Sequence, residues 1–149
     1  MSKRVLIGSF AGALLAGGTA AGLATASNPA ELSLDSASAR YTAPSGDGTG
    51  SFSFTADVSD DSGVESLHVL PWPAGSELDP TGKELRAARE TATCRTTSDE
   101  ASRCTYTLKV SAPEAAALEA GTWKITALAT AEDGDTLLVP SAATFEVER

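Results

Sequence analysis

Six carboxylates of this 149-residue chain gather in two short polar segments. They are Asp57, Asp60 and Asp61 in the first segment and Glu132, Asp133 and Asp135 in the second. Calcium takes about six to eight oxygen ligands, several of which come from backbone carbonyls of such loops. Ordinary turn chemistry is the alternative, because Asp-rich turns are common without any ion. We therefore expect solvated turns and no cofactor, with calcium binding at these six residues as the alternative.

Catalytic chemistry finds little support in the residue types. His68 is the only histidine, and it lies in a strand-like run of apolar and β-branched residues. A serine or cysteine nucleophile needs a base beside it and an acid that orients the base. The chain also lacks the G-x-S-x-G sequence of a nucleophile elbow. We therefore predict that the protein is not an enzyme, and keep a hydrolase with an unfamiliar site as an alternative.

Cys94 and Cys104 are the only cysteines. In an exported chain such a pair indicates a disulfide, whereas a structural metal site needs about four ligands. Closing this loop stabilises the fold by about 3 kcal/mol in the chain-entropy description. The loop carries Arg95 and Arg103. If the protein were a secreted inhibitor of trypsin-like proteases, these are the residues that it would present to the enzyme.

Trp72 stands between Pro71 and Pro73 at the end of a strand-like run. An aromatic ring held in such a segment can dock a partner or a sugar ring. Trp72, Arg95 and Arg103 are therefore the candidate partner-binding residues. For Trp72 itself, the favoured interpretation is that the ring folds over the edge of the core as a lid. Trp123 alternates with other apolar residues and is predicted to lie in the core.

Alternating apolar and polar residues predict the strands that would position these groups. The pattern covers residues 52–58, 64–70, 104–110 and 123–130, with further strand material at 137–139 and 145–147. Ser111 is expected to cap a short helix that runs to Glu119, and residues 84–91 form a second. The predicted fold is an all-β sandwich of about seven short antiparallel strands with one or two helical turns. A small barrel is the alternative.

The N-terminus has the three parts of a secretory signal. Lys3 and Arg4 precede an uncharged apolar run over residues 5–15, and Ala24-Thr25-Ala26 supplies a cleavage site. A retained anchor is the alternative, although a membrane-spanning helix needs about 20 predominantly apolar residues. We therefore expect a signal peptide at 1–26, a flexible lead-in or edge strand at 27–38, and the sandwich domain at 39–149. The protein is predicted to be secreted.

The negative net charge of the chain argues against some classes of binding partner. Because Lys3 and Arg4 leave with the signal and no acidic residue does, cleavage changes the net charge from −9 to −11. Nucleic acids and anionic membranes require a positive footprint. We expect neither as a partner. A soluble monomer that contacts a protein or an envelope glycan fits this charge better.

Two segments resemble bacterial immunoglobulin-like domains. FTADVSDDSGV, from Phe54, resembles the hairpin of their second and third strands. GTWKITALAT, from Gly121, together with Phe145-Glu146-Val147, resembles their final two strands. This resemblance implies that the two acidic segments lie at the same end of the sandwich. The usual immunoglobulin disulfide joins the two sheets, whereas these cysteines are too close in sequence, so the bridge should clip a hairpin or an irregular loop.

The whole chain also resembles small secreted actinobacterial proteins that are grouped as a domain of unknown function. The shared features are Arg40-Tyr41-Thr42-Ala43-Pro44, the Trp72-Pro73 pair, and Cys94 with Cys104-Thr105-Tyr106. That resemblance implies no activity. The sequence thus predicts an exported, non-enzymatic binding or interaction module at or outside the cell envelope. A calcium-stabilised envelope module and a protease inhibitor are the alternatives.

Overall fold

The computed structural model describes residues 31–148, so the predicted signal peptide lies outside the described residues. The strands are β1 (Ser33–Thr42), β2 (Gly50–Ser59), β3 (Val64–Pro73), β4 (Thr93–Ser98), β5 (Ala101–Val110), β6 (Gly121–Ala131) and β7 (Thr136–Val147). The helices are α1 (Gly82–Ala88) and α2 (Ala112–Ala117). The predicted all-β fold with seven strands and two short helices is confirmed. Within residues 31–148, no helix combines the length and the apolar character needed to cross a membrane.

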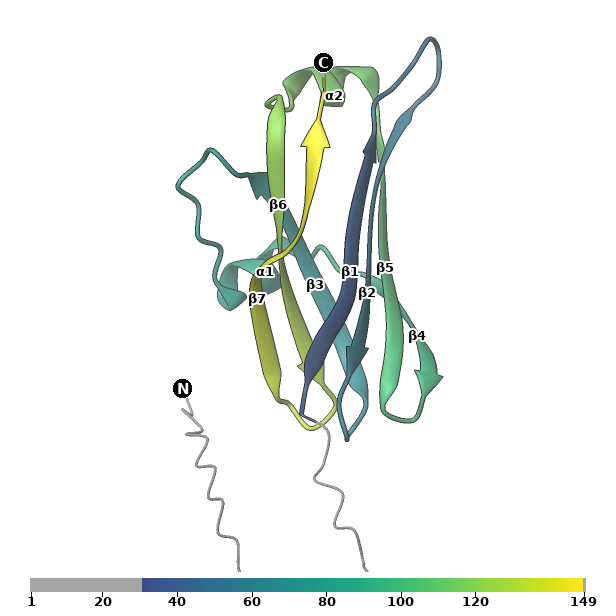
Figure 1. The fold of residues 1–149 in the computed structure, drawn as a ribbon, viewed down its shortest axis with the longest axis vertical. Helices are drawn as coiled ribbons and strands as arrows, with labels where there is room; N and C mark the ends of the chain where they lie inside the picture. Colours follow the sequence, from purple (N-terminus) through teal and green to yellow (C-terminus); the bar gives the residue numbers. More distant parts are fainter. Residues whose placement is uncertain (1–30, 149) are drawn as a thin grey trace, which may run out of the picture.

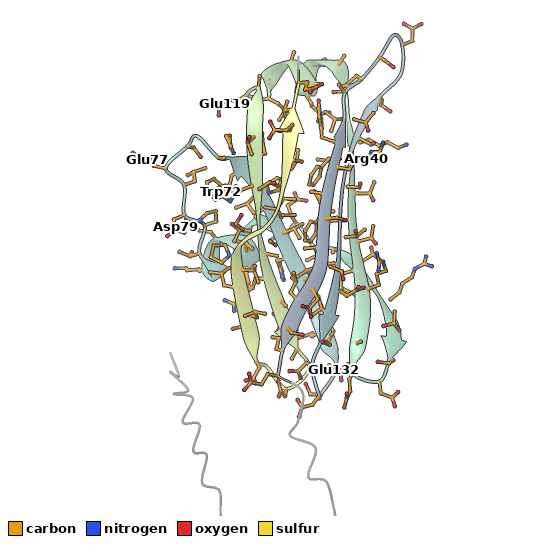
Figure 2. All side chains as sticks on the ribbon, in the orientation of Figure 1. Arg40, Trp72, Glu77, Asp79, Glu119 and Glu132 are labelled. Carbon is orange, nitrogen blue, oxygen red and sulfur yellow. A yellow bond between two sulfur atoms is a disulfide. The ribbon has the colours of Figure 1, made fainter. Side chains whose placement is uncertain are left out.

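The strands form two antiparallel sheets that face each other, which is a sandwich (Figure 1). One sheet has the order β1-β2-β5-β4 and the other has the order β3-β6-β7. At one side of the molecule β1 and β7, which belong to different sheets, contact each other. Helix α2 closes the end of the sandwich where the chain terminates, and the two acidic turns lie at the opposite end (Figures 1 and 2).

The main core lies between the sheets and follows the alternation seen in the sequence. In β2 the inward residues Phe52, Phe54, Ala56 and Val58 are at most 4% exposed, and most of the outward residues are half-buried. They pack with the inward residues of β6, among them Ile125. Because successive side chains of a strand point to opposite faces, one apolar set per strand is enough to fill this layer.

A second, smaller core lies on the outer face of the β3-β6-β7 sheet. Thr126 and Leu128 point to this face of β6 and are at most 2% exposed. Helix α1 packs over them and buries Leu85 completely. Thr81 caps α1 in a reciprocal capping box with Glu84, which fixes where the helix begins. Strand β6 is therefore buried on both faces.

After α1 the chain crosses from one sheet to the other. The backbone N–H of Val69 donates to the carbonyl of Glu90 at 3.0 Å, and that of Ala92 donates to the carbonyl of Leu67 at 2.8 Å. This short segment thus covers the free edge of β3 before the chain joins β4 beside β5. It determines where β4 begins.

Several predicted boundaries were wrong. The edge-strand alternative holds from Ser33, so the domain begins before residue 39. Strand β3 continues through Pro71 and ends at Pro73 instead of ending at Leu70, because an edge strand of a sheet tolerates residues that lack an N–H. Residues 136–147 form one strand with an irregular register. The helices are shifted or shorter, and β4 was missed because all its residues except Cys94 are polar.

Candidate functional site

The two acidic segments do meet at one end of the sandwich. Carboxylate oxygens of Asp60, Asp61 and Asp133 all lie within 4.8 Å of one another. The two turns are joined by a hydrogen bond of 3.0 Å from the N–H of Glu132 to the carbonyl of Gly63. Gly63 has a φ of 101°, and a Cβ there would lie 3.1 Å from the Glu132 side chain. The positive φ favours glycine at this position, and a larger residue would also require the Glu132 side chain to shift slightly.

Asp60 is the structural centre of this cluster. It is 1% exposed, and its Oδ2 accepts hydrogen bonds from the N–H and the hydroxyl of Ser62 at 2.9 and 2.5 Å. The N–H of Asp133 donates to the same hydroxyl at 3.1 Å. Desolvation and the neighbouring carboxylates of Asp60 and Asp133 raise the pKa of Asp61 above its usual value. The cluster is thus held together by turn hydrogen bonds while its exposed members repel one another.

Three of the six predicted calcium ligands lie outside this group. Asp57 forms an ion pair with Arg103 at 3.1 Å on the outer face of the β1-β2-β5-β4 sheet. Glu132 packs beside Gly63, and the N–H of Asp135 donates to Oδ1 of Asp133 at 2.9 Å. Calcium binding at the remaining three carboxylates stays a prediction.

The two cysteines form a disulfide across the β4–β5 hairpin, with a Cα–Cα distance of 4.0 Å. The expectation that the bridge clips a hairpin is therefore met. Cys104 is fully buried, and both cysteines pack against the main core. The residues that flank them, Arg95 and Arg103, are paired directly opposite each other on the outer face, and both are exposed.

Arg95 and Arg103 belong to regular strands rather than to an extended loop. The turn that joins β4 to β5 instead contains Asp99 and Glu100. A protease inhibitor presents extended backbone to an enzyme cleft, whereas this backbone is paired within a sheet. This placement disfavours the bait-loop hypothesis for the two arginines.

The outward residues of the hairpin form what we call the arginine–threonine face: Thr93, Arg95, Arg103, Thr105, Thr107 and Lys109, all of which are exposed. Together with Thr91, most of these residues line an open depression of about 590 Å³. The depression exists because β4 begins only at Thr93, so that β5 beyond Thr105 has β2 on one side and no paired strand from the described part of the chain on the other. The crossing segment borders it, and the Tyr106 hydroxyl donates to the Glu90 carboxylate there.

The sequence contains a pattern that predicts part of this face. Arg95 directly follows Cys94 and Arg103 directly precedes Cys104, so both arginines lie between the two cysteines in the sequence. If the cysteines pair across a hairpin, the adjacent arginines must pair too, and alternation places them on the opposite face. The depression itself was not visible in the sequence, because it depends on where the crossing segment meets β4.

Trp72 does not lie at the surface, so its proposed docking role was wrong. It is 8% exposed and packs in the second core, with its indole Nε1 2.9 Å from Oγ1 of Thr126. Figure 2 places it on the side of the β3-β6-β7 sheet that carries the loop with Glu77 and Asp79. The lid interpretation was the better one. The Lys124 ammonium lies 5.4 Å from the ring centroid.

Trp123 is half-buried rather than fully in the core. Its ring lies 6.0 Å from that of Phe145, and its Nε1 donates to the carbonyl of Glu119 at 2.8 Å. It lines an apolar pocket of about 340 Å³ beneath α2, together with Tyr41 and Leu108. Trp123 is therefore less buried than the alternation pattern predicted, and Trp72 is the more buried of the two tryptophans.

His68 lies on the face of β3 that α1 covers. Its Nδ1 is buried without a hydrogen-bond partner, and desolvation together with the Arg86 cation lowers its pKa. The residue also forms an isolated bridge with Thr91 of the crossing segment. This environment is that of a packed strand residue.

No curated protein and no solved structure matches the chain. One family model matches residues 34–129, a range that runs from β1 into β6. The matched range includes both cysteines, the arginine–threonine face and the first acidic turn. The chain therefore belongs to a family of unknown function, DUF5707.

Proposed function

We propose that the protein is an exported, non-enzymatic, immunoglobulin-like module that acts by surface contact with a component of the cell envelope. The observation that carries this proposal is the contrast between the two outer faces of the sandwich. On one of them, helix α1 packs over β3 and β6. The other, on β1-β2-β5-β4, has no helix packed on it within residues 31–148 and exposes cationic and hydroxyl side chains, together with the carboxylates of Asp35 and Asp57.

The strand order supports the immunoglobulin-like assignment. In constant-type immunoglobulin domains the sheets contain strands A-B-E-D and C-F-G. Lettering β1 to β7 as A to G gives the same two sheets in the same order. Such sandwiches host many roles, so the fold alone does not identify the partner.

Export is supported by the signal-like N-terminus and by the disulfide. Disulfides persist in oxidising compartments such as the exterior of a bacterium. Expression of the full chain in an actinobacterial host tests whether the protein is exported. We expect the medium or the envelope to contain a protein whose first residue is Ser27, as determined by mass spectrometry. Recovery of the intact 149-residue chain from the cytoplasm alone would contradict export.

Co-sedimentation with isolated cell envelopes tests the interaction itself. The purified Ser27–Arg149 protein should sediment with envelope fragments and be released by competing soluble envelope polymer. A sedimented fraction no larger than that of an unrelated acidic protein of similar size would overturn the proposed function. The comparison with an acidic protein is needed because net charge alone alters adsorption.

A further inference from the structure

We propose that the arginine–threonine face binds an acidic polysaccharide, with a carboxylate of the sugar chain held between Arg95 and Arg103. This inference rests on the proposed function, because it names the class of envelope component that the surface contacts. Three properties of the molecule support it: the like charges that the fold places side by side, the hydroxyls around them, and the negative charge of the rest of the molecule.

The fold places two like charges side by side without a full set of counterions. Arg95 and Arg103 are register partners across β4 and β5, and like charges directly opposite each other destabilise a strand pair. The disulfide between the adjacent residues Cys94 and Cys104 holds this register. Asp57 pairs with Arg103 at 3.1 Å, whereas Arg95 has no ion-pair partner among residues 31–148. A carboxylate between the two guanidinium groups would supply the missing charge.

Arginine suits this role because its planar guanidinium donates two parallel hydrogen bonds to one carboxylate. Two arginines on neighbouring strands thus offer donors from both sides of a bound anion. The partner carboxylate of Asp57 faces Arg103 from β2, which leaves the β4 side open. Arg95 is therefore the residue on which binding should depend most.

Threonine hydroxyls surround the arginines as a sugar chain would require. Thr93 and Thr105 form the next outward pair along the hairpin. Thr91 and Thr107 border the depression of about 590 Å³, which lies within the size range of about 300–1,000 Å³ typical of ligand sites. The row of hydroxyls continues across the sheet to β2 and β1, where Oγ1 of Thr55 and Oγ of Ser38 lie 2.9 Å apart. An extended, hydroxyl-bearing polymer fits this open arrangement better than a compact ligand.

The distribution of charge favours an anionic partner at this face alone. The whole chain has a net charge of −9, yet β4 and β5 contain three basic residues and no acidic one. The acidic residues near by are Asp99 and Glu100 in the turn, Asp57 in β2 with its register partner Asp35 in β1, and Glu90, whose carboxylate accepts from Tyr106. Because the field of the molecule repels anions elsewhere, it should orient an acidic polymer toward the hairpin.

Calorimetric titration with a defined polyuronate, polygalacturonate, tests the proposal on the Ser27–Arg149 chain. This chain contains every residue that the structure describes. We expect saturable binding that weakens as salt is raised, because exposed charges are screened beyond about 10 Å at 0.1 M ionic strength. Neutral dextran should not bind. Arg95→Gln should weaken polyuronate binding by about tenfold or more, since hydrogen bonds to charged groups are the stronger class.

Lys83→Gln is the matched control, because it removes the same charge from an exposed position on α1, which packs on the other sheet. It should leave the affinity nearly unchanged. Folding of each variant is checked by thermal melting. The melting temperature of Arg95→Gln should equal or exceed that of the wild type, because the like-charged neighbour of Arg103 is gone. A loss of binding in this variant could not then be attributed to unfolding.

Four outcomes would overturn the inference: no polyuronate binding by the wild type, equal binding of dextran, equal losses in the two variants, or tighter binding of inorganic polyphosphate than of polyuronate. The last would assign the face to phosphate anions rather than to an acidic sugar. A wild type that sediments with envelopes but ignores polyuronate would refute this inference and leave the proposed function standing. Failure in both assays would refute both.

Discussion

The indole Nε1 of Trp72 donates a hydrogen bond of 2.9 Å to Oγ1 of Thr126, and joins β3 to the central strand of its sheet. The same hydroxyl donates to the carbonyl of Pro140 at 2.9 Å. Pro140 lies where the register of β6 and β7 is irregular. One fully buried threonine hydroxyl thus links all three strands of this sheet beneath α1.

Trp72→Ala should be more damaging than Trp123→Ala, although Trp123 is the tryptophan that the alternation pattern places in the core. Trp72 is 8% exposed and loses both its packing and its hydrogen bond. We expect a loss of about 3–5 kcal/mol in the free energy of unfolding. Trp123→Ala should cost less, because that ring is half-buried. Urea unfolding of the two variants provides the comparison, and a larger loss for Trp123→Ala would show that the second core contributes little.

Removing the disulfide should destabilise the fold without abolishing it. The bridge closes a loop with a sequence separation of 10, and such a constraint stabilises by about 3 kcal/mol in the chain-entropy description. The main core between the sheets does not depend on it. Melting of the Cys94→Ala, Cys104→Ala double variant should therefore remain cooperative at a lower temperature. A variant that no longer gives β-sheet circular dichroism at 25 °C would disprove this.

His68 should make the protein less stable as the pH falls below about 6.5. Its pKa is lowered in the folded state from the usual 6.5 by desolvation and by Arg86. The folded state therefore binds fewer protons than the unfolded state in this window. The stabilisation is complete above 6.5 and is lost as the pH falls toward the lowered value. His68→Leu should remove this slope between pH 7.5 and 5.5 in melting experiments, and an unchanged slope would exclude His68 as its source.

Asp61→Asn should raise the melting temperature at pH 7 in chelator. The pKa of Asp61 is raised by desolvation and by Asp60 and Asp133, so the folded state binds more protons than the unfolded state. The associated destabilisation is absent below the usual pKa of 3.8 and develops as the pH rises. The advantage of the variant should therefore shrink toward pH 3. A variant that melts below the wild type at pH 7 would indicate that the charge is stabilised there.

Calcium binding at Asp60, Asp61 and Asp133 is tested by melting in calcium and in chelator. An ion at about 100 times its Kd that binds the folded state alone adds about 2.7 kcal/mol. We expect little change, because Ser62 already occupies Oδ2 of Asp60 and three carboxylates supply few of the six to eight oxygens that calcium takes. A calcium-dependent rise that Asp133→Asn removes would establish the site instead.

The sequence by itself determined the main core and the class of fold. Period-2 alternation in β2, β5 and β6 required two facing layers, because each strand carries one continuous apolar face. The turn glycine at position 63 and the helix caps at Thr81 and Ser111 depend on residues within a few positions of one another, so short sequence patterns can predict them. The pairing of the two cysteines followed from their number.

Only the tertiary structure decided which surfaces are free. Trp72 and His68 look available in the sequence, yet α1 covers the face of β3 to which they belong. The acidic segments meet because two hairpin turns pack against each other, and Asp57 leaves that group because Arg103 is its register partner. The arginine–threonine face depends on where a crossing segment joins β4. These relationships connect residues far apart in the chain, and local residue patterns do not encode which sheet a segment will cover.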